Sequence, residues 1–448
     1  MTLPADFAWG AATSAYQIEG ARHADGKGES IWDRWSDLGN VPGTGDVTCD
    51  HYHRWRDDIA LMADLGLKAY RFSIAWTRVL PDGDGAVNQA GLDFYSRLVD
   101  ELLAHGIEPW PTLYHWDLPQ ALQDRGGWPE RSTVDAFERY ASVTTAALGD
   151  RVSRWMTHNE PWVATFIGHL DGRFAPGMTD WRAALPAAHH ILLSHGRAVA
   201  AIRSAVPGAQ VGIALDCRPN RPAGGSAADV AAARHFDGFR NRWFFDPVFG
   251  KGYPADMVEA YRERGRIDGA VGEPPPFVHP GDMDTIAAPI DFCGLNYYTS
   301  IAISADADES EDTGVPQSAD PPDGYTEMGW PITPDALTDY LVHLHQAYRP
   351  KALVITENGA SYSDGPDADG VIDDQRRIAY LEAHIAAVEA AAGQGVPMAG
   401  YFAWSLLDNL EWTSGYAQRF GLVWVDHDTQ QRIPKASGHW YRDRIARS

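Results

Sequence analysis

Eight short apolar runs of strand length recur along the chain, and segments with helical periodicity separate them. The runs cover residues 7–12, 69–76, 107–114, 154–157, 210–215, 291–298, 352–356 and 398–405. In residues 57–65, for example, Ile59, Met62 and Leu65 recur at helical spacing and Gly66 follows. This pattern predicts an amphipathic helix that ends at a glycine. Strands that alternate with helices eight times predict a (β/α)8 barrel with elaborated βα loops.

The domain organisation follows from the absence of a dividing linker. A chain of 448 residues is long enough for two or three domains. The polar stretch 305–323 and the Ala/Gly-rich stretch 222–233 both fall between strand–helix units. We therefore interpret them as surface loops, and we expect residues 1–448 to form one catalytic barrel domain.

Charge and cysteine content narrow the class of protein. The 37 basic and 61 acidic side chains give 37 − 61 = −24, which argues against partners such as nucleic acid or an anionic membrane. The first residues lack both a basic region and an apolar stretch of signal-peptide length. Cys49, Cys217 and Cys293 are an odd, scattered set, as expected of reduced thiols. We expect a cytoplasmic protein.

Two glutamates, Glu160 and Glu357, each follow an apolar run. Carboxylates at the ends of parallel barrel strands lie where catalytic groups of this architecture collect. Hydrolysis of an acetal needs a proton for the departing oxygen and stabilisation of positive charge at the anomeric carbon, and two carboxyl groups supply both. A separation of roughly 5 to 5.5 Å would imply a nucleophile and retention, and roughly 6.5 to 9.5 Å would imply inversion.

Several motifs, in order along nearly the whole chain, resemble those of glycoside hydrolase family 1, the β-glucosidase family. The two glutamates lie in Thr157-His158-Asn159-Glu160-Pro161 and Ile355-Thr356-Glu357-Asn358-Gly359, which are similar to the two signatures of that family. Further matches are residues 7–20, 70–76, 114–119, 296–299, 404–412 and 419–422. The resemblance implies a TIM barrel and a cofactor-free hydrolase that retains the anomeric configuration.

The resemblance also implies individual roles. Glu160 would be the general acid and then the general base, and Glu357 would be the nucleophile. Four residues would support catalysis: Arg71, Asn159, Asn296 and Tyr298. Seven would contact the sugar: Gln17, His115, Trp116, Trp404, Glu411, Trp412 and Phe420. Three would line the aglycone site: Trp162, His169 and Trp330.

Substrate preference rests on two details. Relatives that cleave 6-phosphorylated glycosides lack the Glu-Trp pair, whereas Glu411-Trp412 is intact here, and a carboxylate there would repel a phosphate. Thioglucosidases of the family carry glutamine where Glu160 stands. We therefore expect hydrolysis of terminal β-D-glucosyl residues of O-glycosides, including cellobiose and short oligosaccharides, which suggests a role in cellulose degradation.

Alternatives stay open within and beyond this activity. The same chemistry on β-galactosides or β-fucosides, or on a broad range of β-glycosides, is the nearest. A sugar-binding barrel without turnover is an alternative from a different class. One departure from the family is Phe174, at a position where histidine is usual, so the aglycone preference is open.

The sequence gives no pattern for a metal or a nucleotide. The pairs His51/His53, His189/His190 and His343/His345 lack metal-binding spacing, and no HExxH motif occurs. No glycine-rich phosphate loop follows a strand in the Rossmann manner. We expect no metal and no cofactor, and the sequence predicts no oligomeric state.

Overall fold

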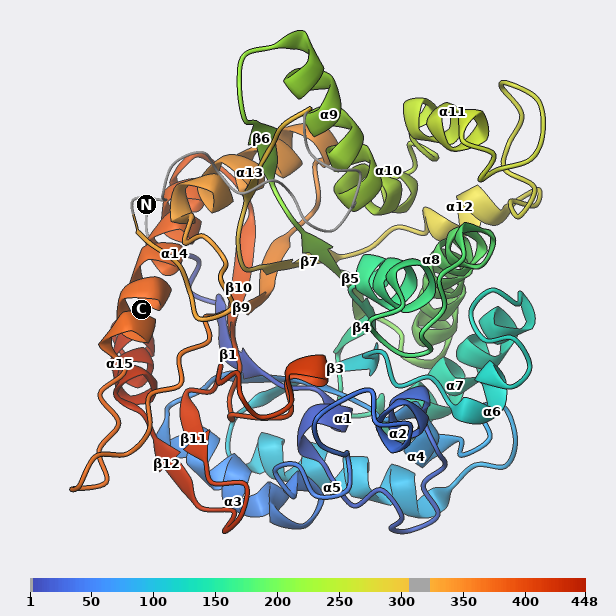
Figure 1. Ribbon diagram of the computed structural model, residues 1–448. Helices are drawn as coiled ribbons and strands as arrows, with labels where there is room; N and C mark the ends of the chain where they lie inside the picture. The colour runs from blue at the N-terminus through green and yellow to red at the C-terminus, as the bar shows by residue number, and fades with distance from the viewer. Residues whose placement is uncertain (1–2, 306–322) are drawn as a thin grey trace.

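The computed structural model describes residues 3–305 and 323–448, and its centre is a closed barrel of eight parallel strands. Around the barrel the strands follow the order β1, β2, β3, β4, β5, β7, β9 and β10, and β10 pairs with β1 to close the ring. Figure 1 looks along this barrel, with the helices outside the strands. The strands are β1 Ala8–Ala12, β2 Ala69–Ser73, β3 Glu108–Tyr114, β4 Arg154–Asn159, β5 Gln210–Cys217, β7 Phe292–Tyr297, β9 Leu353–Asn358 and β10 Met398–Trp404.

Each predicted apolar run overlaps one of these strands, although β4, β5 and β9 extend two residues beyond their runs, and the predicted (β/α)8 barrel is confirmed. Strands of a parallel barrel are buried on both faces and therefore read as continuous apolar runs. Inside the barrel, Trp110 packs against Phe292 and Phe402, with ring centroids 5.3 and 5.1 Å apart. These three rings fill the barrel interior together with small residues such as Ala69 and Ala214.

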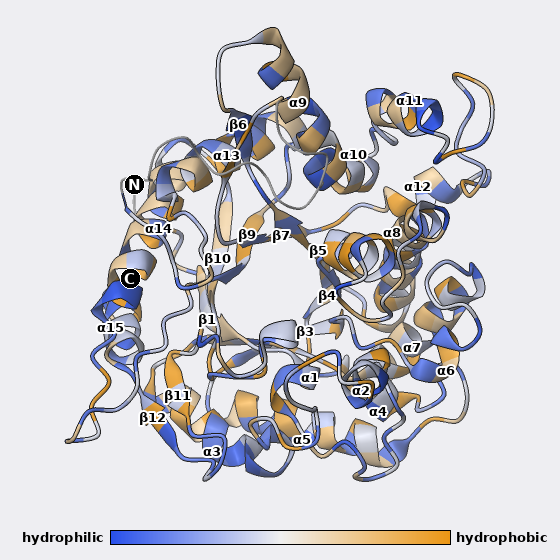
Figure 2. Cartoon of the chain, in the orientation of Figure 1, coloured by the Kyte–Doolittle hydropathy of each residue, from blue (hydrophilic) through white to orange (hydrophobic). Residues whose placement is uncertain are grey.

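Helices surround the barrel, and most of them carry hydrophobic and hydrophilic residues together, as Figure 2 shows for α3 and α8. They are α1 Ala15–Ile18, α2 Ile31–Asp37, α3 His51–Asp64, α4 Trp76–Val79, α5 Gln89–Ala104, α6 Gln120–Gln123, α7 Ser132–Leu148, α8 Trp181–Ala205, α9 Ala227–Asp237, α10 Trp243–Val248, α11 Ala255–Glu263, α12 Asp282–Ile286, α13 Pro334–Tyr348, α14 Gln375–Gly393 and α15 Ala436–Ile445. The predicted helix 57–65 is the C-terminal part of α3, and Gly66 follows with φ +67°.

Irregular elements lie outside the barrel wall. Two π-helices, η1 Val163–Asp171 and η2 Gly238–Arg242, follow β4 and α9, and the 3-10 helix η3 Trp412–Ser414 follows β10. Two small sheets pair β6 Asn220–Pro222 with β8 Ile301–Ile303 and β11 Val423–Val425 with β12 Arg432–Pro434.

The interpretation of stretch 222–233 as a loop was wrong, because α9 begins inside it at Ala227. Ser226 caps this helix by accepting a hydrogen bond from the backbone N–H of Asp229, and alanine is the strongest helix former. Of the other predicted loop, residues 306–322 lie outside the described residues.

Candidate active site

The predicted site residues gather at the carboxyl-terminal ends of the barrel strands. Asn159 ends β4 and Glu160 follows it, while Glu357 is the last but one residue of β9. Asn296 lies near the end of β7 and Trp404 ends β10. Because parallel strands run in one direction, these ends meet at one mouth of the barrel.

A cavity of about 340 Å³ at this mouth contains both glutamates in its wall, a volume within the usual range for small-molecule sites. Its aromatic lining is His115, Trp116, Trp162, Phe174, Tyr298, Trp330, Trp404, Trp412 and Phe420. Its polar lining includes Arg173, Asp216, Arg218, Arg240, Asn296 and Glu411. A larger hollow of about 770 Å³ lies between α9 and α13, but neither glutamate lines it. The paired carboxylates therefore assign the chemistry to the smaller cavity.

Both oxygens of Glu357 are engaged. Arg71 Nη1 lies 2.5 Å from Oε1, and the Tyr298 hydroxyl donates to Oε2 at 2.6 Å. Arg71 is 1% exposed and Glu357 is 3% exposed. Burial raises the pKa of Glu357, whereas Arg71 and Tyr298 pull the same pKa down. The two partners therefore fix the carboxylate in place and favour its charged form.

Glu160 has no such cation in direct contact among the hydrogen bonds of the described residues. Asn296 Nδ2 donates a hydrogen bond to Oε1 of Glu160 at 2.8 Å, and Glu160 is 7% exposed. Burial, then the charges of Asp216 and Glu357, raise the pKa of Glu160 well above its usual value. These surroundings favour the protonated form of Glu160 over its charged form.

Asn159 and Asn296 connect the two carboxyl groups. Arg71 Nη2 and Asn296 Nδ2 both donate to Asn159 Oδ1, at 2.6 and 2.9 Å. One continuous network therefore runs from Glu357 through Arg71, Asn159 and Asn296 to Glu160. Such a network limits movement of the two carboxyl groups relative to each other.

Three residues at the cavity have the left-handed backbone that non-glycine residues seldom adopt: Trp116 at φ 76°, Glu160 at φ 47° and Trp412 at φ 44°. Such conformations cost about 1–3 kcal/mol each and cluster at functional sites. Their positions at the cavity agree with a functional site, where the orientation of the side chains is kept at the expense of a favourable backbone conformation.

Six of the seven predicted sugar-contacting residues, all except Gln17, line the cavity and form an aromatic and polar wall. His115 stacks with Trp404 and Trp412, with ring centroids 5.9 and 6.0 Å apart. Burial and the nearby Arg71 lower the pKa of His115 well below its usual value, so the ring is neutral and its Nε2 accepts a hydrogen bond from Asn159 Nδ2 at 3.2 Å. Burial, with the charge of Glu357, raises the pKa of Glu411 to about 8.

Gln17 lies beside this wall and is not among the residues that line the cavity. The side chain is fully buried, and its Nε2 donates to Asn409 Oδ1 and to the Leu410 carbonyl. Gln17 also lowers the pKa of Glu411 by a hydrogen bond, so the structure brings it next to a residue that does line the cavity.

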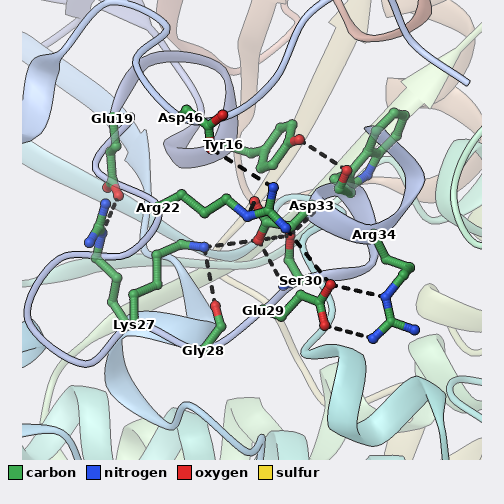
Figure 3. A network of polar contacts seen from close by, with 12 residues as sticks. Tyr16, Glu19, Arg22, Lys27, Gly28, Glu29, Ser30, Asp33, Arg34 and Asp46 are labelled. Atoms are coloured by element: carbon green, nitrogen blue, oxygen red, sulfur yellow. Dashed lines mark hydrogen bonds and ion pairs between the residues drawn. The ribbon is translucent and has the colours of Figure 1, made fainter. Parts of the chain in front are cut away.

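A polar network around Asp33, shown in Figure 3, holds the chain segment at the start of α2. Asp33 is buried and accepts hydrogen bonds from the Ser30 backbone N–H and hydroxyl, and Lys27 Nζ lies 3.0 Å away. Asp33 belongs to α2, whose Trp32 packs on Trp412 with ring centroids 4.4 Å apart. The network therefore stabilises the ring that forms part of the cavity wall.

Two of the three predicted aglycone residues line the cavity, Trp162 and Trp330. His169 does not belong to the lining residues in the described part of the chain. Its side chain is buried within η1, where Nδ1 contacts the Ala164 carbonyl at 3.2 Å. The π-helix shifts the direction of each side chain relative to an α-helix, and the aglycone role of His169, which was assigned by resemblance, stays a prediction.

Sequence analysis missed the charged residues Arg173, Asp216, Arg218 and Arg240, which line the cavity. Asp216 lies at the end of β5, so the reasoning applied to Glu160 would have identified it. Arg240 lies in η2, far from any strand end, and no local pattern marks it.

The described residues include no cluster of three His, Cys, Asp or Glu side chains that could hold a metal ion. Among the described helices, none has the length and hydropathy that crossing a membrane requires.

Comparison with known proteins gives the family. The model of glycosyl hydrolase family 1 matches residues 1–448. "Beta-glucosidase A" of Acetivibrio thermocellus is 46% identical, over 99% of this chain and 98% of that protein. The solved structure of the family 1 β-glucosidase from Thermotoga maritima has a TM-score of 0.93 at 46% identity, covering 99% of this chain and 98% of that chain. The same enzyme in complex with glucoimidazole also has a TM-score of 0.93, at 45% identity, covering 99% of this chain and 98% of that chain.

The resemblance stated on the motifs is thus confirmed over the full length of the sequence, and with it the assignment to the glycoside hydrolases. The chain belongs to glycosyl hydrolase family 1.

Proposed function

We propose that this member of the family is a retaining β-glucosidase that releases terminal β-D-glucosyl residues through a covalent glycosyl-enzyme ester. The observation that carries this proposal is the different surroundings of two carboxyl groups in one cavity. Arg71 and Tyr298 favour the charged form of Glu357, and burial beside other carboxylates favours the protonated form of Glu160. A nucleophile and an acid are the pair that a double displacement requires.

In the first step a carboxylate oxygen of Glu357 forms a bond to the anomeric carbon, and the bond from that carbon to the glycosidic oxygen breaks. Glu160 gives its proton to the departing oxygen, so the leaving group departs as a neutral alcohol. In the second step Glu160 takes a proton from water, whose oxygen bonds to the anomeric carbon and releases Glu357 as a carboxylate. Two inversions give overall retention.

The charge of Glu357 drives the change in the role of Glu160. While Glu357 is ionised, its charge raises the pKa of Glu160. Once Glu357 is esterified that charge is gone, so the pKa of Glu160 falls and the residue can act as a base. Asn159, which Arg71 and Asn296 orient, is proposed to contact the sugar 2-hydroxyl.

Recognition of the sugar is proposed for His115, Trp116, Trp404, Glu411, Trp412 and Phe420 at the cavity wall, with Gln17 behind Glu411. Imidazole, amide and carboxyl groups bond to hydroxyls, and indole rings cover the apolar face of a sugar. A relative binds glucoimidazole, which supports a small carbohydrate as the substrate. β-Galactosidase or β-fucosidase activity is the less favoured alternative, because the relatives reported above are named β-glucosidases.

Three finer statements remain proposals. We propose that residues 1–448 are one catalytic domain, that cellobiose and short cello-oligosaccharides are natural substrates, and that the enzyme works in the cytoplasm. The cavity volume of about 340 Å³ lies within the usual range for small-molecule sites, which supports a short saccharide as the substrate.

A substrate panel tests the proposed activity. The expected result is hydrolysis of p-nitrophenyl β-D-glucoside with a higher kcat/KM than the galactoside and the fucoside, and negligible hydrolysis of the 6-phosphoglucoside. Faster hydrolysis of the 6-phosphoglucoside than of the plain glucoside would contradict the role given to Glu411. If none of the four substrates is hydrolysed, the sugar-binding barrel without turnover is favoured.

A further inference from the structure

A buried ion cluster holds the chain segment that carries Glu411. Its centre is Asp408, which precedes Glu411 by three residues and is 0% exposed. Lys435 Nζ lies 2.7 Å from Asp408 Oδ1, and Arg419 Nη1 lies 2.9 Å from Asp408 Oδ2. Lys435 is also 0% exposed, and it is the only buried lysine among the residues that the structure describes. Neither Asp408 nor Lys435 is among the described residues that line the cavity, so the cluster acts on a substrate only through the residues that it holds.

Asp408 joins two chain segments that both contribute to the aromatic and polar wall of the cavity. The first segment, residues 404–412, includes three of the residues that line the cavity. In the second segment, Phe420 lines the cavity between Arg419 and Gly421. The Arg419 guanidinium contacts Asp408, and the backbone N–H of Gly421 donates a hydrogen bond to Asp408 Oδ1 at 2.8 Å. Asp408 therefore fixes the position of one segment relative to the other.

Lys435 connects Asp408 to a third part of the chain. Lys435 directly precedes α15, which lies outside the barrel (Figure 1), and its backbone N–H donates to the Leu422 carbonyl at 2.9 Å. Burial lowers the pKa of Lys435 to about 8, whereas the charge of Asp408 acts in the opposite direction. A buried ion pair adds little stability, because desolvation offsets the attraction, but loss of either partner leaves an unpaired buried charge. The pair therefore constrains where Asp408 can lie.

Glu411 has few contacts of its own that fix its direction. Its Oε2 is buried and has no hydrogen-bond partner among the described residues, and Gln17 is the hydrogen-bonding group that acts on its pKa. The backbone around it is held more firmly, since the Glu411 N–H donates to the Gly415 carbonyl at 2.7 Å and Gln17 Nε2 donates to the Leu410 carbonyl at 2.9 Å. The direction of the Glu411 carboxyl group thus depends on the position of its backbone, which Asp408 holds three residues earlier.

We propose that Asp408, Lys435 and Arg419 are positioning residues for substrate recognition. They hold the chain segment of Glu411 so that its carboxyl group meets the 6-hydroxymethyl group of the sugar, and the cluster thereby sets the preference for hexosides over pentosides. The inference rests on the proposed β-glucosidase activity, in which Glu411 is expected to face the 6-position. That part of the sugar does not react, so a displaced Glu411 changes which sugars are accepted.

Two substrates with the same leaving group test the inference: p-nitrophenyl β-D-glucoside and p-nitrophenyl β-D-xyloside, which lacks the 6-hydroxymethyl group. The readout is the ratio of kcat/KM for the glucoside to kcat/KM for the xyloside. The wild-type ratio should be well above one, because a site that hydrogen-bonds a substrate hydroxyl rejects an analogue without it. In Lys435→Met the ratio should fall by about fivefold or more, since small displacements of a contacting group are costly.

Two further variants separate positioning from folding. Arg419→Gln removes the second cation of Asp408, and because the Arg419 side chain is 20% exposed, this variant should fold even if Lys435→Met does not. The ratio should fall in Arg419→Gln as well. Asp282→Asn is the matched control, because Asp282 is also buried and contacts Arg131 and His189, and none of these three is among the described lining residues. Asp282→Asn should lower the free energy of unfolding without changing the ratio.

Glu411→Ala shows whether the cluster acts through Glu411. This variant alone should lower the ratio. Lys435→Met added to it should leave the lowered ratio unchanged, because no carboxyl group remains to be positioned. A further fall in the double variant would contradict the assigned route through Glu411.

An unchanged ratio in Lys435→Met and Arg419→Gln would overturn the inference, and so would a wild-type ratio at or below one. Because the readout is a ratio within each variant, partial unfolding or a general loss of activity does not affect it. Failure of the wild type to hydrolyse both glycosides would instead count against the proposed β-glucosidase activity.

Discussion

At the scale of single residues, Glu160 and Glu357 differ only in their surroundings. Glu357 has a guanidinium 2.5 Å away, and Glu160 has an amide donor together with two nearby carboxylates. Opposite charge favours the ionised form of a carboxyl group, and burial with like charge favours the protonated form. The assignment of nucleophile and acid roles thus depends on Arg71 and Asp216 as much as on the glutamates.

The first prediction concerns Glu160→Ala. Substrates with poor leaving groups, such as cellobiose, should lose about 10²–10⁴-fold in kcat/KM because their departing oxygen needs a proton. Dinitrophenyl glucoside should lose far less, because its leaving group departs as a stable anion. The measurement is kcat/KM for both substrates, and equal losses would count against the assignment of Glu160 as the acid.

The second prediction concerns Glu411→Gln and the stability of the protein. The pKa of Glu411 is about 8 in the folded protein against a usual value of 4.5. Between these two pH values the folded state keeps a proton that the unfolded state releases, so stability falls as pH rises. Relative to the glutamine variant, the wild type should lose at most about 1.4 kcal/mol of unfolding free energy per pH unit. The loss should be smaller in practice, because Glu411 lines a cavity that water can enter.

Urea unfolding of both proteins at about pH 5 and about pH 8 measures this difference. The glutamine variant should gain stability over the wild type as pH rises. A difference between the two proteins that does not change with pH would contradict the raised pKa of Glu411.

At the scale of elements, close approach between the ends of β9 and β10 fixes the position of Glu357. Gly359 follows β9, and a Cβ placed on it would lie 1.8 Å from the Trp404 carbonyl oxygen at the end of β10. The ends of β9 and β10, which carry Glu357 and Trp404, therefore lie so close together that no side chain fits at position 359. Gly196 in α8 has a similar restriction, since its Cβ would lie 1.9 Å from the Thr285 carbonyl oxygen, but that contact joins α8 to α12.

The third prediction compares Gly359→Ala with Gly196→Ala. Both should lower the free energy of unfolding, by about 1–3 kcal/mol or more, because backbone must move to relieve each contact. Only Gly359→Ala should also lower kcat per folded molecule, by about tenfold or more, since small displacements of catalytic groups are costly. The measurement is urea unfolding together with kcat. Equal effects on kcat in the two variants would show that the contact at Gly359 does not position Glu357.

The strands could be predicted well from the sequence, and the irregular elements could not. A buried parallel strand is a continuous apolar run, which is why the end of β4 and hence Glu160 were found. The π-helices η1 and η2 have no sequence signature of their own, so the inward direction of Arg240 and the burial of His169 could not be foreseen. Gln17 was assigned by resemblance, and its contacts with Asn409 and Leu410 depend on packing between distant segments.

At the scale of the whole molecule, the first and last strands close one barrel. β1 pairs with β10 from Ala8 to Ala12, and in α15 the Tyr441 hydroxyl donates to the Gly10 carbonyl at 2.9 Å. The two ends of the chain therefore depend on each other. This closure supports the proposal of one domain, because the ring of strands closes only when both ends of the chain are in place.

The fourth prediction follows from this closure. Unfolding in urea should give one transition, with coincident midpoints from tryptophan fluorescence and far-ultraviolet circular dichroism. Tryptophans are present both inside the barrel, as Trp110, and at its mouth, as Trp404, so fluorescence reports on both regions. Two separated transitions would contradict the single domain.

The most direct test of the central claim is the reaction of Glu357→Gly with p-nitrophenyl β-D-glucoside in the presence and absence of azide. Without azide the variant should be inactive, because no group can attack the anomeric carbon. With azide, turnover should return and the product should be α-glucosyl azide, identified by proton NMR, because azide occupies the space of the missing carboxylate. Absence of rescue, or a β-glucosyl azide, would contradict Glu357 as the nucleophile.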